Sequence, residues 1–392
     1  MDPMLTWMQV SALAVAGMCH ALLGSVKVSL ARKLDIDEAR VGGLVSVFGF
    51  TLIPMVLAAG FLVDALGKQT VLGAGFVLVI VSLLMLGSLH SYRMALLAVL
   101  VLGVGWSALV NVLNVTTPPA FLPAEETSER LAYAMNLGDF IFGMGAFLTP
   151  IAVAILIRRI RLERTFLALA ALAVVPLLLG LGVDWEKLVT ESTETVSGGL
   201  RILLADRVVW LCCLAFFFHV PVEAAVATWA TTLMTDKGVA EGRAAMLLSV
   251  FWLTFMLSRL ATAIALLTIP NLPPNADTLL VIVLASLSVA FTLGIVQSRS
   301  ASLTCAMVVI AGLVLGPIFP TLIAILLGHV QPSLHGRAVG LFFCIGGIGW
   351  TVIPMLIGAY AKRATVQRAF LIGTACAALL TVLCITLNNY LP

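Results

Sequence analysis

The sequence predicts an all-α membrane protein with twelve transmembrane helices in two six-helix halves. Three observations predict it: a hydrophobic composition, apolar runs of helical length, and one polar stretch near the middle. Of the 392 residues, 61% are hydrophobic and 10% are charged, whereas roughly a quarter of the residues of a soluble protein are charged. The apolar runs lack the two-residue alternation of an outer-membrane barrel, so we expect helical spans.

Twelve apolar runs are long enough to cross a hydrocarbon core, which needs about 20 helical residues. They are 5–30, 41–66, 70–89, 94–115, 131–157 and 165–183, then 208–234, 244–268, 278–297, 302–328, 338–361 and 369–387. Between the two groups lies the one polar stretch long enough to be a linker. We therefore expect an N-terminal six-helix bundle over residues 1–183, a central cytoplasmic linker over 184–207 and a C-terminal six-helix bundle over 208–392.

A short internal repeat supports two related halves. The pattern G-x-G-x-x-x-x-P occurs at Gly143–Pro150 and again at Gly347–Pro354, in the fifth run of each half. Transporters built from duplicated halves carry such traces at corresponding positions. Chance is the alternative, because glycine and proline are common in membrane helices.

The turn after the second run reads G-x-x-x-D-x-x-G-K, formed by Gly60, Asp64, Gly67 and Lys68. Gly67 permits a tight turn and Gly60 a close helix approach, while Asp64 can accept hydrogen bonds. This pattern resembles the signature loop of the major facilitator superfamily, and the resemblance implies the fold of that family. It also implies a cytoplasmic loop that latches the two halves in one state of transport. Gln69 stands where the family usually has a second basic residue, which implies a weaker latch.

Orientation is the point on which two signals disagree. If the signature loop and both termini are cytoplasmic, that side holds six basic residues: Lys68, Arg130, Lys187, Arg201, Arg207 and Arg337. The other side then holds fourteen: Arg32, Lys33, Arg40, Arg93, Arg158, Arg159, Arg161, Arg164, Lys237, Arg243, Arg299, Lys362, Arg363 and Arg368. The positive-inside rule favours the opposite orientation. We follow the loop and expect cytoplasmic termini in a bacterial inner membrane.

Glu223 is the only carboxylate in the run 208–234. An unpaired charge at bilayer depth costs at least about 2.5 kcal/mol, so such residues face a partner or a water-filled cavity. Pro221 lies two positions earlier and frees the carbonyl of Phe217 from the helical hydrogen-bond pattern. Broken helices that carry a charge often border a transport site.

Several segments of the chain match a narrower group of the family. They are Val220–Glu223 followed by Trp229, Trp252 followed by Arg259, Gly316–Thr321, and Asn136 with Gly143 and Gly145. Together they resemble the fucose, glucose and galactose cation symporters, which implies a monosaccharide as the solute. Pro221 and Ser258 replace glycines of that branch, and Asp139 replaces its histidine. Carboxylates that the proton-coupled fucose members carry in their first and fourth helices are absent here.

Arg259 is the natural partner for Glu223. Trp252 and Arg259 are seven residues apart, about two helical turns, and so share a face. Glu223 and Arg259 each lie near the middle of consecutive antiparallel runs, and a buried pair would leave neither charge stranded. The pair can be a fixed structural ion pair, or it can line the cavity and respond to substrate or cation.

Amides and a second carboxylate lie in the first half. Asn136 and Asp139 share one stripe of the run 131–157, and Asp139 is a second candidate for cation coupling or a carboxylate near the helix end. Asn111 and Asn114 share a face, and their amides can bind sugar hydroxyls or join helices. His20, Trp229 and Trp252 complete the candidates; each can contact substrate or be an ordinary core residue.

These observations predict a secondary transporter that takes up a monosaccharide together with H⁺ or Na⁺ by alternating access, and not an enzyme. Asp139 or Glu223 would then carry the coupling proton, or sodium would be the coupling ion instead. A proton-driven exporter of drugs or metabolites is one alternative, and a non-transporting membrane scaffold or sensor is another. The expected partners are the solute, the coupling cation and the lipid bilayer. We expect a monomer that binds no nucleic acid, cofactor or metal.

Overall fold

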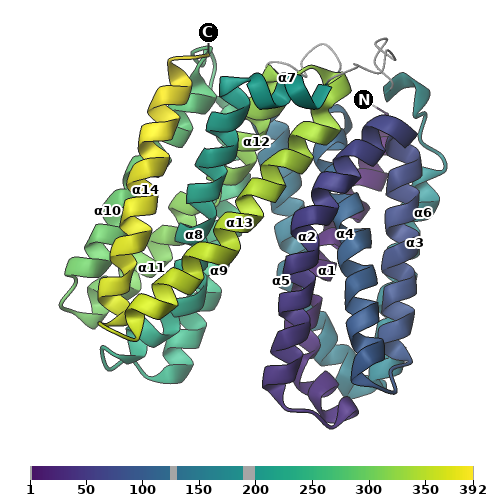
Figure 1. The fold of residues 1–392 in the computed structure, drawn as a ribbon, viewed down its shortest axis with the longest axis horizontal. Coiled ribbons are helices and arrows are strands. Elements are labelled where there is room, and N and C mark those ends of the chain that lie inside the picture. The colour runs from purple at the N-terminus through teal and green to yellow at the C-terminus, as the bar shows by residue number, and fades with distance from the viewer. Residues whose placement is uncertain (1, 124–129, 189–198, 392) are drawn as a thin grey trace. The chain divides into compact units, whose positions relative to one another are not determined.

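A computed structural model describes residues 2–123, 130–188 and 199–391. Twelve helical stretches in this described part are long and apolar enough to cross a membrane, as the hydropathy pattern predicts. The described chain divides into two compact units, which Figure 1 draws in a single view. Each unit is a bundle of packed helices and is described by itself below.

Unit 1 comprises residues 1–129, 141–199 and 331–344. Its helices are α1 (Pro3–Leu34), α2 (Glu38–Leu66), α3 (Lys68–Gly87), α4 (Tyr92–Phe121), most of α5 (Leu131–Arg159), α6 (Leu162–Gly180) and the short turn η2 (Glu186–Leu188). Helix α4 packs against α2 and α3, and α6 lies beside α3 (Figure 1). The side of α6 that faces away from this core exposes Leu167, Leu172 and Leu178, as expected of a surface in contact with lipid.

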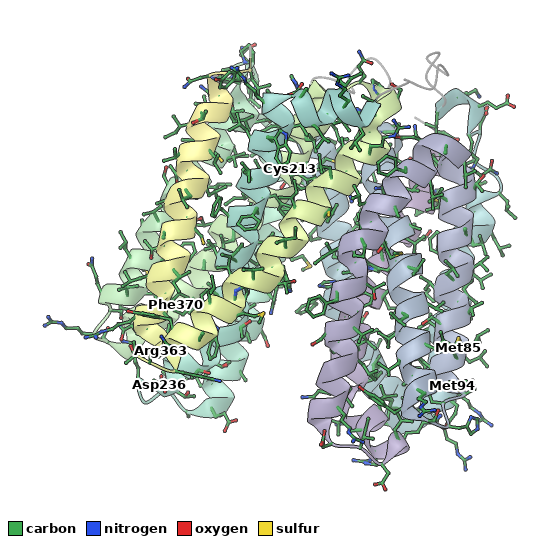
Figure 2. The ribbon with its side chains drawn as sticks, in the orientation of Figure 1. Met85, Met94, Cys213, Asp236, Arg363 and Phe370 are labelled. Atoms are coloured by element: carbon green, nitrogen blue, oxygen red, sulfur yellow. The ribbon has the colours of Figure 1, made fainter. Side chains whose placement is uncertain are left out.

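Unit 2 comprises residues 130–140, 200–330 and 345–392. Its elements are the start of α5, α7 (Gly199–Ala205), α8 (Arg207–Thr235), α9 (Glu241–Thr268), α10 (Ala276–Gln297), α11 (Ala301–Leu315), α12 (Ile318–His329), most of α13 (His335–Ala361) and α14 (Val366–Asn388), whereas η3 (Pro332–Leu334) belongs to unit 1. Helix α14 packs between α8 and α10. Figure 2 places Cys213 within α8, where it is fully buried, and Asp236 and Arg363 at the loop end of this unit.

The units differ in two places from a simple division at the expected linker. The first ten or so residues of α5 belong to unit 2, and the first turns of α13 belong to unit 1. A polar contact accompanies each assignment: Asp139 of α5 pairs with Arg259 of α9, and Arg337 of α13 pairs with Asp64 of α2. Residues 189–198 of the expected linker lie outside the described residues.

The expected run 302–328 is two helices, α11 and α12, separated at Gly316–Pro317. Prolines cause this break, since Pro317 and Pro320 have no N–H to donate to the carbonyls four residues earlier. One of those carbonyls belongs to Gly316, and it becomes available to a side chain. The hydropathy pattern does not reveal the break, because both pieces are continuously apolar.

The repeated G-x-G-x-x-x-x-P pattern serves the same purpose in both halves. Any Cβ at Gly145 would overlap the carbonyl of Ala14 in α1, and any Cβ at Gly349 would overlap the carbonyl of Phe217 in α8. Each glycine therefore lets its helix touch the backbone of the first long helix of its own half. The carbonyl of Phe217 is the one that Pro221 leaves without a helical donor.

Gly145→Val is expected to destabilise unit 1, because the added side chain forces α5 away from α1. Such overpacking costs about 1–3 kcal/mol. Gly24→Val on α1 is the matched control, since no atom lies within 4 Å of a Cβ built there. Thermal unfolding in detergent should show a lower midpoint for Gly145→Val alone; equal midpoints for the two variants would contradict this packing.

Helix α8 has a well-defined start, which fixes the height of its functional residues. Asp206 caps it and accepts hydrogen bonds from the amides of Val208 at 2.8 Å and Val209 at 3.2 Å. His329 approaches the same carboxylate at 2.9 Å. Burial raises the pKa of Asp206, but the hydrogen bonds from His329 and the two amides outweigh it, so this pKa lies below its usual value.

Candidate functional site

The strongest polar cluster within a span is built around Arg259 of α9, in unit 2. Its side chain is buried, and its Nε donates a hydrogen bond to the carbonyl of Gly316 at 3.0 Å. Its two terminal nitrogens contact Asp139 of α5, one at 3.3 Å from the backbone oxygen and the other at 3.1 Å from Oδ2. Arg259 therefore joins the break between α11 and α12 to the first third of α5.

Two features of the sequence prepare this position for an arginine. Pro320 leaves the carbonyl of Gly316 without its helical donor, and the guanidinium supplies one. The ring of Phe255, one turn earlier on α9, lies 4.4 Å from the guanidinium carbon, which adds a cation–π contact. Trp252 in turn lies edge-on to Phe255 at 5.5 Å. Trp252 and Arg259 thus share one face of α9, as their spacing predicts.

The expected ion pair between Glu223 and Arg259 is replaced by a different arrangement. Arg259 pairs with Asp139, while the nearest charged contact of Glu223 is His219 Nε2 on the same helix, at 3.7 Å. The charges of Arg259 and Asp139 both still act on Glu223. Helical spacing gives the depth of Glu223 and Arg259, but it does not reveal that α5 brings a competing carboxylate to the arginine.

Among the described residues, Glu223 therefore has no lysine or arginine at ion-pair distance. Its side chain retains 15% of its exposure, whereas that of His219 is fully buried. Neither ring nitrogen of His219 has a hydrogen-bond partner in the described chain. At 3.7 Å the imidazole is too far for a hydrogen bond to Glu223, so the carboxylate can accept a proton or a small cation without breaking one with the imidazole.

Further polar groups of unit 2 lie buried and only partly satisfied. Asn136 donates from Nδ2 to the carbonyl of Ala132 at 2.9 Å and to Oγ1 of Thr321 at 3.1 Å, but its Oδ1 has no partner among the described residues. Trp229 Nε1 is likewise buried without one, and its ring lies against Gly358 of α13. Buried polar atoms normally find a partner, so these exceptions mark places where a ligand or water can bind.

The polar candidates of unit 1 make contacts within that unit. Asn111 donates from Nδ2 to the carbonyls of Val56 at 3.3 Å and Gly336 at 3.0 Å, joining α4 to α2 and to the start of α13. Asn114 donates to Val110 of its own helix at 2.8 Å. His20 stacks on Trp106 with 5.7 Å between ring centroids, and the indole of Trp106 donates to the carbonyl of Ala16. The structure thus uses Asn111 as a link between helices.

The signature loop also lies in unit 1, and it pairs with α13. Asp64 Oδ2 lies 2.9 Å from Arg337 Nε, and Gly60 lies directly against the backbone of Gly336. Gly67 ends α2 and starts α3 with a φ of 85°, a conformation that suits glycine. Lys68 donates to the carbonyl of Leu188 at 3.0 Å. Sequence reasoning does not identify Arg337 as the partner; its one signal is a lone basic residue in the turn before 338–361.

The described residues form twelve apolar spans with charged groups buried among them, which is the architecture of a multi-pass membrane protein. The chain belongs to the Major Facilitator Superfamily, whose sequence profile matches residues 10–354. This confirms the family resemblance of the signature loop. Among curated proteins, none matches the sequence.

Solved structures of three other transporters share the fold. The Escherichia coli fucose:proton symporter FucP is similar with a TM-score of 0.81 and 14% identity, over 97% of this chain and 98% of that one. The human organic anion transporter MFSD10 has a TM-score of 0.77 and 15% sequence identity, over 97% of this chain and 99% of that one. The proton:xylose symporter XylE, bound to 6-bromo-6-deoxy-D-glucose, has a TM-score of 0.74 and 13% sequence identity, over 97% of this chain and 94% of that one. At these identities the similarity establishes the fold.

Proposed function

We propose that this transporter takes up a small polar solute, a monosaccharide, together with H⁺ or Na⁺. The observation that carries the proposal is the largely buried set of Asp139, Arg259, Glu223 and His219, drawn from α8, α9 and the part of α5 that belongs to unit 2. Burying several ionisable groups at mid-span depth is costly, and membrane proteins keep them where charges or protons must move.

The ion pair between Arg259 and Asp139 suggests different roles for Arg259 and Glu223. Arg259 has its charge balanced by Asp139 and donates two of its five N–H groups to carbonyls, so it holds α5, α9 and the α11–α12 break together. Glu223 lies 3.7 Å from the His219 imidazole, is influenced by the charges of Arg259 and Asp139 without an ion-pair contact to either in the described chain, and keeps some exposure. A proton or sodium ion at Glu223 neutralises a charge that the bilayer interior disfavours, and this changes the free energy of the conformations that bury it.

The solute class is supported by polar and aromatic groups on the same helices as these charges. The free acceptor of Asn136 and the free donor of Trp229 suit hydroxyl groups, and exposed Trp252 offers a flat apolar surface to a sugar ring. FucP and XylE, which share the fold, carry names that describe sugar symport. His20, Asn111 and Asn114 remain candidates for contacts from the first half.

Counterflow in proteoliposomes tests the function. Vesicles loaded with unlabelled fucose, xylose or glucose should accumulate the labelled form of at least one of them transiently, without any ion gradient. Adding an inward H⁺ or Na⁺ gradient should then drive net uptake. Failure of every sugar to exchange would remove the substrate assignment, and extrusion driven by an inward proton gradient would favour the exporter.

The membrane orientation is part of the proposal: both termini and the Gly60–Lys68 loop lie in the cytoplasm of an inner membrane. A cysteine introduced by Arg161→Cys, between α5 and α6, should then react with an impermeant thiol reagent added to intact cells. A cysteine introduced by Gln69→Cys, next to the signature loop, should react only after the membrane is opened. The reverse pattern would overturn the orientation in favour of the positive-inside rule.

A further inference from the structure

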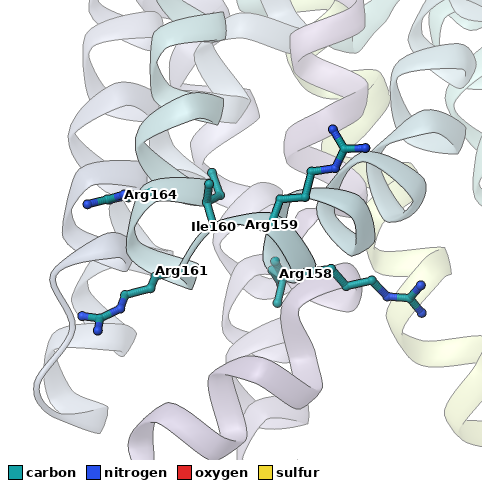
Figure 3. A pocket seen from close by; sticks show the side chains of 6 residues that line it. Arg158, Arg159, Ile160, Arg161 and Arg164 are labelled. Atoms are coloured by element: carbon teal, nitrogen blue, oxygen red, sulfur yellow. The ribbon is translucent and has the colours of Figure 1, made fainter.

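The turn between α5 and α6 gathers four arginines that the transport mechanism does not use. Arg158, Arg159, Arg161 and Arg164 line a hollow of about 530 Å³ together with Ile157 and Ile160 (Figure 3). In Figure 3, Arg158 and Arg159 extend to one side of the turn and Arg161 and Arg164 to the other. The turn therefore presents positive charge in two directions.

Among the described residues these four charges are balanced only in part, since the carboxylate of Glu163 interacts with Arg161. All four side chains are exposed, and none makes a hydrogen bond or ion pair with any described residue. The one carboxylate in the same turn, Glu163, is held by Lys33 Nζ at 2.8 Å, and that ammonium also donates to the carbonyl of Gly87 at 2.7 Å. The turn thus has an excess of positive charge within seven residues.

The position of the turn identifies its ligand. Helix α5 ends at Arg159 and α6 begins at Leu162, so the arginines stand where two spans leave the hydrocarbon layer. Ile151 and Ile155 on α5 and Leu167 on α6 are exposed within about two turns of them, as expected of side chains in contact with lipid tails. A ligand that contacts both the arginines and the exposed apolar side chains therefore has an anionic head group next to an apolar part.

We propose that the α5–α6 arginine turn binds the phosphate groups of anionic phospholipids in the leaflet opposite the Gly60–Lys68 loop. Guanidinium groups match phosphate oxygens with two parallel hydrogen bonds, and their planar forks keep this geometry at a membrane surface. The amides at the start of α6 add a favourable dipole, since Arg161 caps that helix without a side-chain hydrogen bond. Bound lipid would anchor the ends of α5 and α6 at the interface.

The test measures lipid binding by the purified full chain. Quenching of tryptophan fluorescence by brominated phosphatidylglycerol is compared with quenching by brominated phosphatidylcholine in mixed micelles, for three proteins. The first is the wild type. The second combines Arg158→Gln, Arg159→Gln, Arg161→Gln and Arg164→Gln. The third is the matched control, which removes the same total charge from exposed positions of unit 2 by Arg299→Gln, Lys362→Gln, Arg363→Gln and Arg368→Gln.

The wild type and the control should bind phosphatidylglycerol at least about tenfold more tightly than phosphatidylcholine, and the α5–α6 variant should lose this preference. An unchanged preference in the α5–α6 variant, or an equal loss in the control, would overturn the proposal. Addition of inorganic phosphate distinguishes the source of the anion: displacement of the lipid at millimolar phosphate would assign the turn to a soluble anion instead. The readout does not depend on transport, so it stands apart from the proposed function.

Discussion

Arg259→Gln is expected to lower the stability of the transporter by about 3–5 kcal/mol, the cost of leaving one member of a buried ion pair without its partner. The substitution strands the carboxylate of Asp139 and removes the donor that satisfies the carbonyl of Gly316. Three elements, α5, α9 and the α11–α12 break, lose their common link. Equilibrium unfolding in detergent micelles measures this loss.

Two further variants identify the cause. Arg243→Gln removes a positive charge from the exposed start of the same helix and should change stability by less than about 0.5 kcal/mol. Asp139→Asn combined with Arg259→Gln removes both charges and should recover part of the loss, because no bare charge remains buried. If Asp139→Asn lowers the stability of the Arg259→Gln variant by as much as it lowers the stability of the wild type, then the two residues are not energetically coupled.

Glu223→Gln is expected to abolish concentrative uptake while leaving the fold intact. Glutamine has nearly the same shape, but it cannot take up a proton or balance a sodium ion. A tenfold ion gradient coupled one to one can sustain about tenfold accumulation of solute. The variant should therefore stop at an accumulation ratio of about one, and its thermal midpoint should match that of the wild type.

Glu241→Gln is the matched control for this variant. Glu241 lies exposed at the start of α9, and its neutralisation removes the same charge from the surface of unit 2. It should accumulate solute as the wild type does. A thermal midpoint of Glu223→Gln far below that of the wild type would show that Glu223 stabilises the fold, and this result would contradict its role in coupling.

The fold was accessible from the sequence because its signals are local. Runs of apolar residues give the spans, and the pattern around Gly60 and Asp64 gives the family. The repeated glycine-proline pattern is also local, and the structure shows why it recurs: Gly145 and Gly349 make the same backbone contact in each half. The break at Gly316–Pro317 is concealed by uniform hydropathy, although the two prolines that cause it are visible.

The site was accessible only in part because pairing depends on packing. Helical periodicity gives the depth of Glu223 and the shared face of Trp252 and Arg259. It does not say which carboxylate reaches the arginine, and the packing of α5 decides in favour of Asp139. The partner of Asp64 also could not be identified from the sequence. Arg337 is more than 270 residues away in the chain and lies beside Asp64 only after folding.

The central claim is that Glu223 couples solute movement to a cation, and ion-driven uptake in proteoliposomes tests it most directly. Wild-type vesicles under a tenfold inward H⁺ or Na⁺ gradient should concentrate the labelled sugar identified by counterflow, up to about tenfold. Glu223→Gln vesicles should not concentrate it under either gradient. Equal, gradient-dependent accumulation by the two proteins would contradict the account.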